Sequence, residues 1–349
     1  MYCPYCYEPI RHRVLVCRSS QCAMYEQSLP DRPPRLRARL PERLRIRGGA
    51  RLADREIRCD VCGQPCACVC ESCGREIPAA WLRYPAKNVL FLGMSGVGKS
   101  TLLASSKLAL SGLKGFVFSP LEAENTAERF YDRYTGPLTE RQAQLPHTEN
   151  ELPMPFLWGA SCRRGPSEAS ACTLAVYDVP GEMVHCHADI APVERLLALA
   201  DSVVLAVNPA SLPQVRDACG QAAAHIEPAP DAWERAERIL DELLVFHSIG
   251  TRCGVKLAVV LTHLDVWFAS LKDCASASAL NDPYLRQLVA GWRGSAFLSR
   301  LSEFRDQRLF ATGLYRGGET LPLTGAQAPM GYLMERMGLR LPAGARIRG

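Results

Sequence analysis

One eight-residue segment restricts the possible fold more than any other part of the sequence. Residues 93–100 read Gly-Met-Ser-Gly-Val-Gly-Lys-Ser and match the pattern G-x-x-x-x-G-K-[ST]. The apolar run 87–92 before them predicts a buried strand, and residues 99–110 predict a helix. Glycines let backbone N–H groups turn toward an anion, beside the positive end of the following helix. The sequence therefore predicts a phosphate-binding loop in an α/β fold.

The expected roles within this loop follow from its chemistry. Lys99 would reach the β- and γ-phosphates of a nucleotide, and it is also a candidate catalytic residue. The Ser100 hydroxyl would hold Mg²⁺. The candidate nucleotide-binding residues are Gly93, Ser95, Gly96, Val97, Gly98, Lys99, Ser100 and Thr101.

Strands and helices alternate along the rest of the chain. The apolar periodicity predicts strands over 115–119, 156–162, 172–177, 202–207, 256–262 and 308–311. Helices are expected over 121–134, 192–200, 231–246, 283–291 and 329–337, and a long loop over 135–155. This alternation predicts a mostly parallel sheet with helices on both faces, in a domain spanning 87–340.

Two of the predicted strands end in side chains suited to nucleotide chemistry. Asp178 ends the strand Ala-Val-Tyr-Asp, where its carboxylate could hold Mg²⁺ through water. Gly181, three residues later, offers a backbone N–H that could sense a γ-phosphate. Asp265 follows the strand 256–262, and its carboxylate could accept two hydrogen bonds from guanine, whereas adenine has no such donor pair. Thr262 and His263 lie in the same motif.

Taken in order, these motifs resemble the translation-factor-related and Ras-like class of P-loop GTPases. The resemblance covers about residues 87–340 and rests on residues 93–100, Asp178-Val-Pro-Gly181 and Thr262-His-Leu-Asp265. The family reads the base with [NT]-K-x-D, and here His263 replaces the lysine that packs along the base. The cysteine-rich N-terminus and the long loop before Asp178 also look similar to the bacterial double-GTPase group associated with conflict systems.

The resemblance implies further residues. A switch threonine should lie between the phosphate loop and Asp178, and of Thr135, Thr139 and Thr148 we favour Thr148 as the one that contacts Mg²⁺ and the γ-phosphate. Many relatives place a glutamine after the D-x-x-G glycine to orient the attacking water, and Glu182 stands there in this chain. Slow or partner-dependent hydrolysis is therefore expected. The family's short base-contacting loop is matched by Ala311 and Thr312.

Ten of the sixteen cysteines lie within the first 73 residues, mostly as close pairs. No signal-peptide pattern precedes them, so paired cysteines favour a metal over disulfides. Two C-x-x-C-G knuckles predict one Cys₄ zinc site from Cys59, Cys62, Cys70 and Cys73. A second predicted zinc site uses Cys3, Cys6, Cys17 and Cys22, with His12 as an alternative ligand. Cys66 and Cys68 lie between the knuckles and could substitute for a ligand, and an iron–sulfur cluster is the competing interpretation.

The cysteine pairs define a zinc module over residues 1–80, interrupted by an arginine-rich linker. Ten arginines lie between residues 32 and 58, so contact with nucleic acid is one expectation for this module, and recruitment of a protein partner is another. No apolar run is long enough for a transmembrane helix. We expect a cytoplasmic protein.

The leading functional expectation is a GTP- and GDP-binding switch with Mg²⁺, slow hydrolysis and a zinc module that recruits a partner. Two alternatives remain open from the sequence. One is a nucleotide-binding scaffold without turnover, which His263 and Glu182 would fit. The other is an ATPase that acts on nucleic acid. Base preference and turnover separate these three.

Overall fold

A computed structural model describes most of the chain. The described residues are 1–11, 14–17, 19, 21–22, 58–59, 61–121, 125–139, 153–164, 168–181, 191–224, 226, 229, 231–249, 252–268, 271, 280–313 and 325–342. The candidate residues Thr148, Glu182 and His12 lie outside this set, as does almost all of the arginine-rich linker.

The large domain is built on one sheet. Within the described residues its strands run in the order β10-β9-β7-β3-β6-β5-β4, and β8 pairs with β9. The five strands from β10 to β6 are parallel, which confirms the predicted α/β class. The bounds are β3 Ala86–Leu92, β4 Phe116–Pro120, β5 Phe156–Arg164, β6 Glu168–Asp178, β7 Ser202–Val207, β8 Ser248–Ile249, β9 Arg252–Leu261 and β10 Phe304–Ala311.

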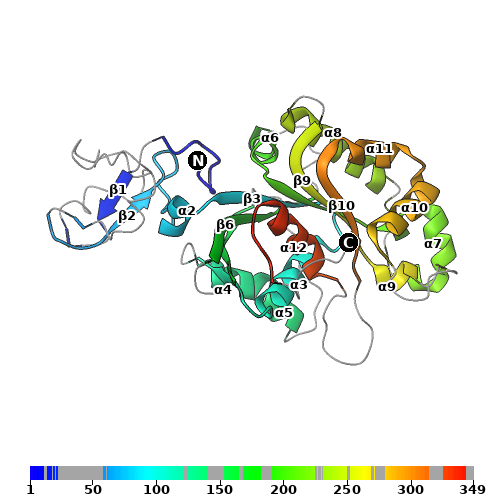
Figure 1. Cartoon of the computed structure of the whole chain (residues 1–349), viewed down its shortest axis with the longest axis horizontal. Helices are drawn as coiled ribbons and strands as arrows, with labels where there is room; N and C mark the ends of the chain where they lie inside the picture. The colour runs from blue at the N-terminus through cyan, green and yellow to red at the C-terminus, as the bar shows by residue number, and fades with distance from the viewer. Residues whose placement is uncertain are drawn as a thin grey trace.

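Helices cover both faces of this sheet (Figure 1). Val89 and Phe91 of β3 face the helices α3 and α12, whereas Leu90 and Leu92 face the opposite helical layer. Burial on both faces explains why β3 is almost continuously apolar. One layer holds α3 Lys99–Ser111, α4 Thr126–Phe130 and α12 Gln327–Arg336, and the other holds α6 Ala191–Ala198, α8 Ala232–His247, α10 Asp282–Arg293 and α11 Ala296–Ser302.

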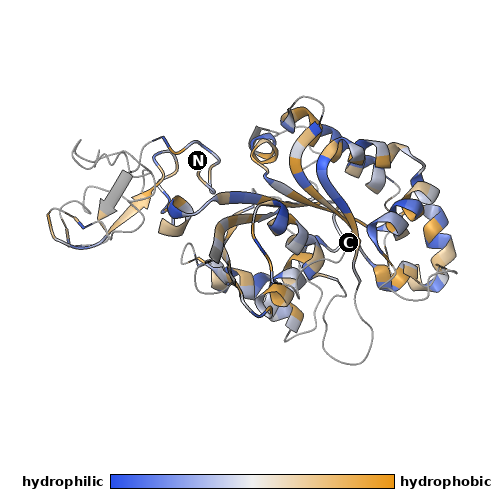
Figure 2. Ribbon diagram, in the orientation of Figure 1, coloured by the Kyte–Doolittle hydropathy of each residue, from blue (hydrophilic) through white to orange (hydrophobic). Residues whose placement is uncertain are grey.

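The two long strands β9 and β10 are polar at their start and apolar toward their carboxyl ends (Figure 2). The shorter elements α7 Pro213–Cys219, η4 Gly220–Ala223 and α9 Leu264–Trp267 lie beyond the carboxyl ends of β7 and β9, with η3 Pro209–Ser211. No helix among the described residues combines the length and the apolar character needed to cross a membrane.

In the mostly parallel sheet, β5 is antiparallel to both of its neighbours, β4 and β6. β5 and β6 are joined by only three residues, which is too short for a parallel crossover. The helix predicted over 121–134 is interrupted. It forms α4, then a single π-helical turn η2 over Tyr131–Thr135, and then α5 Gly136–Thr139. The loop predicted over 135–155 thus begins with helix.

The N-terminal residues form a small unit beside the large sheet (Figure 1). It contains β1 Val14–Cys17 and β2 Cys66–Val69, which pair antiparallel, and α2 Ala79–Arg83. Trp81 of α2 is buried and its Nε1 donates to the Tyr2 carbonyl at 3.1 Å. Ile77 and Tyr7 belong to the same apolar cluster as Leu90 of the large sheet, so the unit shares a continuous core with it.

Candidate functional site

The carboxyl ends of the parallel strands form the candidate site. From the central strand β3 the chain adds β4, β5 and β6 on one side and then crosses to β7 on the other side, so the strand order reverses at β3. In open α/β sheets such a reversal opens a crevice beyond the strand ends, where ligands bind. Residues 93–98, here called the glycine loop, follow β3 directly and lead into α3.

Left-handed backbone makes glycine necessary in this loop. Gly93, Gly96 and Gly98 have φ of 140°, 72° and 84°, values that other residues adopt only with strain. A Cβ on Gly93 would lie 2.4 Å from the Ala206 carbonyl oxygen of β7. Glycine at these positions therefore allows the loop to pack tightly against the sheet.

Lys99 is the first residue of α3 and is only 5% exposed. Its Nζ donates a hydrogen bond to the Met94 carbonyl at 2.8 Å. This bond draws the ammonium back across the glycine loop, beside the N-terminal end of the helix. A lysine charge and a helix N-terminus at one place favour an anion.

Ser100 and Asp178 meet as predicted. Asp178 is the last residue of β6, opposite Phe91 of β3, and it is 2% exposed. The Ser100 hydroxyl donates to Asp178 Oδ2 at 2.6 Å. Tyr134, in the π-helical turn η2, donates to the same oxygen at 2.9 Å. Burial raises the pKa of Tyr134 above its ordinary value, so the phenol keeps the proton that it donates.

Gly181 lies directly against the glycine loop. A Cβ at this position would be 2.5 Å from the Ser95 nitrogen and 2.7 Å from the Met94 carbonyl carbon. The preceding Val179 nitrogen donates to the Phe91 carbonyl at 3.1 Å, which continues the pairing of β3 and β6 past Asp178. The backbone of Asp178–Gly181 thus closes one side of the loop.

The residues that follow β9 and β10 form a second part of the site. The Leu264 nitrogen donates to the Thr312 carbonyl at 3.0 Å. A Cβ on Gly313 would lie 2.9 Å from Asp265 Oδ1, so the turn after Ala311 packs on that carboxylate. These contacts place Asp265 beside the loop of Ala311 and Thr312, in line with the predicted grouping.

His263 joins this second part to the glycine loop. Its backbone is left-handed, with φ of 56°, and its Nδ1 lies 3.1 Å from the Thr262 hydroxyl. Its Cε1 would be 3.7 Å from a Cβ on Gly98. Trp267, fully buried, fixes the turn by donating from Nε1 to the Thr262 carbonyl at 2.7 Å.

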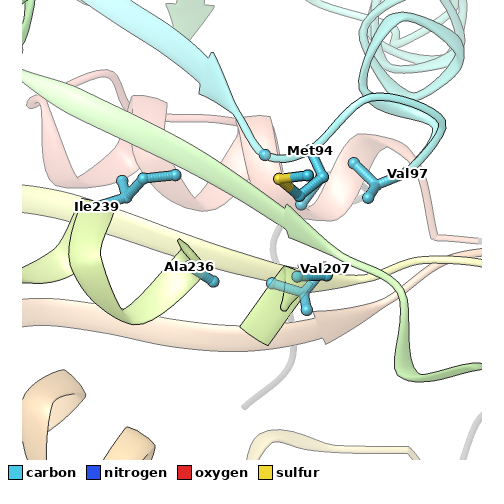
Figure 3. Close-up of a pocket in the computed structure, with 8 residues that line it drawn as sticks. Met94, Val97, Val207, Ala236 and Ile239 are labelled. Atoms are coloured by element: carbon cyan, nitrogen blue, oxygen red, sulfur yellow. The ribbon is translucent and has the colours of Figure 1, made fainter. Parts of the chain in front are cut away.

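The underside of the glycine loop is apolar. Figure 3 shows Met94 and Val97 of the loop facing Val207 of β7 and Ala236 and Ile239 of α8. The space between them is too narrow for a water molecule. The apolar side chains of the loop therefore pack on β7 and α8, and the polar atoms of the loop face away from them.

The eight predicted cysteine ligands assemble into two groups of four, but not in the predicted pairing. We name the two clusters by their order in the sequence. The outer cluster holds Cys3, Cys6, Cys70 and Cys73, and the inner cluster, whose residues lie between Cys6 and Cys70 in the chain, holds Cys17, Cys22, Cys59 and Cys62. The two C-x-x-C-G knuckles, Cys59 with Cys62 and Cys70 with Cys73, therefore belong to different clusters, and the prediction that they share one metal is wrong. The reason is the antiparallel pairing of β1 with β2, which brings the end of β1 beside the start of β2.

The sulfur geometry of both clusters suits a tetrahedral metal. Bonds of about 2.3 Å from zinc to four sulfurs place the sulfurs about 3.8 Å apart. In the outer cluster, Cys3 and Cys73 are separated by 3.8 Å and Cys6 and Cys70 by 3.7 Å. In the inner cluster, the corresponding distances are 3.4 Å for Cys17 and Cys62 and 3.8 Å for Cys22 and Cys59. Both clusters could hold a metal such as zinc.

Each cluster contains a thiol that ionises readily. The hydrogen bond from Cys3 lowers the pKa of Cys73 to about 5, and the backbone amides of Cys62 and Val61 lower that of Cys59 to about 7. Thiolates are the metal-binding form of cysteine. Cys66 pairs with Cys17 across the strands and packs against the inner cluster without being one of its four members.

Sequence reasoning missed Tyr134, which the structure adds to the Ser100–Asp178 pair. No local signal marks a tyrosine at the end of the predicted helix 121–134 as part of a site. Comparison with known proteins finds no family model that matches the sequence and no curated protein that is significantly similar to it.

Proposed function

We propose that this chain is a P-loop GTPase of the translation-factor-related or Ras-like class, which binds GTP and GDP with Mg²⁺ and hydrolyses GTP slowly. One observation carries the proposal. The Ser100 hydroxyl is bonded to the buried Asp178 carboxylate at 2.6 Å, beside a buried Lys99 and a glycine loop at the switch point of the sheet. This combination supplies partners for both a phosphate chain and a divalent cation.

The phosphates would lie along the glycine loop. Its backbone amides, the N-terminus of α3 and the Lys99 ammonium all favour negative charge there. Lys99 would exchange its bond to the Met94 carbonyl for phosphate oxygens. Gly181, packed on the Ser95 backbone, is close enough to the loop for its N–H to respond to a γ-phosphate.

Ser100 and Asp178 fit Mg²⁺, a hard cation that prefers oxygen ligands and retains several waters. Because the Ser100 hydroxyl donates its hydrogen bond to Asp178, its oxygen lone pairs are available to a cation. Bound there, Mg²⁺ would neutralise charge that develops on the phosphate oxygens. Thr148 remains the predicted third ligand.

Base selection is assigned to Asp265. Its carboxylate is held between the turn after Ala311 and the Trp267-anchored backbone, which keeps it fixed for two hydrogen bonds from guanine. His263 stands where the family has a lysine, and its position near the end of the glycine loop would let the imidazole cover one face of the base.

Hydrolysis would need a water oriented at the γ-phosphate, and Glu182 is the predicted residue for that role. Its carboxylate would stand close to phosphate charge, so slow or partner-dependent turnover is expected. Both clusters are assigned to zinc, because four thiolates at these spacings are its usual structural ligands. The zinc module would recruit a partner.

The test is a titration of the zinc-loaded full chain with fluorescent GTP and ATP analogues in Mg²⁺. We expect GTP to bind at least tenfold more tightly than ATP. Asp265→Ala should remove this preference, and Lys99→Ala should weaken both nucleotides. Two exposed residues supply matched controls, since Asp217→Ala and Lys114→Ala should leave both affinities unchanged.

Equal or tighter binding of ATP would contradict the base assignment and favour an ATPase. Binding of GTP without release of phosphate, in the presence of cell extract, would favour a nucleotide-binding scaffold. Failure of Lys99→Ala to weaken binding would remove the glycine loop from the site.

A further inference from the structure

The outer cluster is in direct contact with the strand that carries Asp178. Tyr177, the residue before Asp178, is fully buried, and its hydroxyl donates to the Pro4 carbonyl at 2.7 Å. Pro4 lies between the ligands Cys3 and Cys6. The ring of Tyr7 also packs on that of Tyr177, with centroids 5.8 Å apart. One buried side chain, that of Tyr177, thus connects the metal-binding turn at Pro4 to the strand position next to Asp178, the candidate Mg²⁺ ligand.

The same N-terminal turn makes two further contacts with the large domain. The Tyr7 hydroxyl donates to the Pro153 carbonyl at 3.5 Å. Glu8 pairs with Arg195 of α6 at 2.6 Å, shortly after residues 182–190.

These contacts differ in how much they contribute to the stability of the folded chain. The Glu8–Arg195 pair is exposed and contributes little in water. The Tyr177–Pro4 bond is buried, and a lost partner there would leave a polar group unsatisfied in the core. Tyr177 is therefore the main route of contact between the metal-binding turn and β6.

The inner cluster provides a natural comparison. In the part of the chain that the structure describes, its buried thiols pack with one another and with Cys66. The outer-cluster residues Cys3 and Cys70, in contrast, belong to the core that includes Tyr177 and Leu90. Among the described residues, only the outer cluster shares a core with the large domain.

We infer that metal binding at the outer cluster and nucleotide binding at the glycine loop are thermodynamically linked, with Tyr177 as the positioning residue between them. This inference rests on the proposed function. Linkage is reciprocal, so Mg²⁺ and GTP tighten zinc at the outer cluster by the same factor by which zinc tightens GTP. The inner cluster is outside this linkage.

The test measures zinc affinity at equilibrium, by competition with a chromophoric chelator, for the full chain with and without a non-hydrolysable GTP analogue and Mg²⁺. Two zinc equivalents are expected. The analogue should tighten one of them on the order of tenfold, a common size for coupling between sites, and leave the other unchanged. The paired variant Cys59→Ser with Cys62→Ser should retain only the nucleotide-sensitive equivalent.

Tyr177→Phe keeps the ring and removes the hydroxyl. It should still bind two zinc ions and the nucleotide, but the nucleotide effect on zinc should shrink by about fivefold, the factor that one net hydrogen bond is worth. Tyr332→Phe changes another buried tyrosine, in α12, and should leave the effect intact.

Fluorescence titration of the same samples separates the two proposals. If the GTP analogue binds and neither zinc equivalent responds, or both respond alike, the linkage is refuted while the proposed function stands. If the analogue does not bind at all, both are refuted. A full nucleotide effect in Tyr177→Phe would overturn the role of Tyr177.

Discussion

The hydroxyl of Tyr134 donates to Asp178 Oδ2 at 2.9 Å, the same oxygen that accepts the Ser100 hydroxyl at 2.6 Å. The π-helical turn η2 places Tyr134 there, and single π turns of this kind are frequent at functional sites. The ring is anchored on Phe130 and Phe156, with centroids 5.0 and 5.3 Å away. A water bound to Mg²⁺ at the Ser100 oxygen would have to donate to Asp178 Oδ2, the oxygen that already accepts the Tyr134 hydroxyl.

Tyr134→Phe should therefore lower the Mg²⁺ concentration that half-saturates binding of a fluorescent GTP analogue, by about fivefold. The physical reason is that one competing hydrogen bond is removed while the ring packing stays. Tyr131→Phe, a neighbouring exposed tyrosine in the same turn, serves as the control and should not change it. A higher Mg²⁺ requirement would mean that the phenol orients the carboxylate instead of competing for it.

Gly181→Ala should weaken nucleotide binding at least tenfold and lower the unfolding temperature. The added methyl group would stand 2.5 Å from the Ser95 nitrogen, so either the glycine loop or the 178–181 backbone must shift. Analogue titration and thermal unfolding measure the two effects. Gly254→Ala in β9, where a Cβ meets no atom within 4 Å, is the control. Unchanged affinity in Gly181→Ala would show that this close approach has no part in binding.

The pairing of the cysteine ligands can be tested with crossed double variants. Cys17→Ser with Cys62→Ser removes two ligands of the inner cluster, so the chain should still bind one zinc ion tightly. Cys6→Ser with Cys17→Ser removes one ligand from each cluster and should abolish both tight sites. Zinc content after dialysis measures the outcome. The opposite result would be no tight site in Cys17→Ser with Cys62→Ser and one tight site in Cys6→Ser with Cys17→Ser. It would mean that the two C-x-x-C-G knuckles share one metal, as the sequence suggests.

The sequence predicted most elements of the large α/β domain, because its central strands are buried on both faces and read as short apolar runs. It also predicted which side chains gather at the sheet edge, since Asp178 and Thr262 each follow such a run and parallel strands bring their carboxyl ends together. The contacts of Gly181 with the glycine loop, and of Gly313 with Asp265, agree with that expectation.

Other features depend on contacts that local patterns do not encode. The spacing C-x-x-C fixes which two sulfurs share a turn, but the partner turn is chosen by the pairing of β1 with β2 across the arginine-rich linker. Tyr134 reaches Asp178 from a π turn that interrupts the predicted helix after residue 130. Thr148 and Glu182 lie outside the described residues and stay predictions.

The nested order of the cysteines has a consequence for how the N-terminal unit is assembled. Cys6 and Cys70, of the outer cluster, enclose Cys17 and Cys62, of the inner cluster, in the chain. Filling the inner cluster first would reduce the remaining path between the outer ligands to two short arms, 7–16 and 63–69. The entropy lost on closing a loop falls as the loop shortens. Metal acquisition would then proceed from the inside outward, and the outer cluster, which touches β6, would be the last to form.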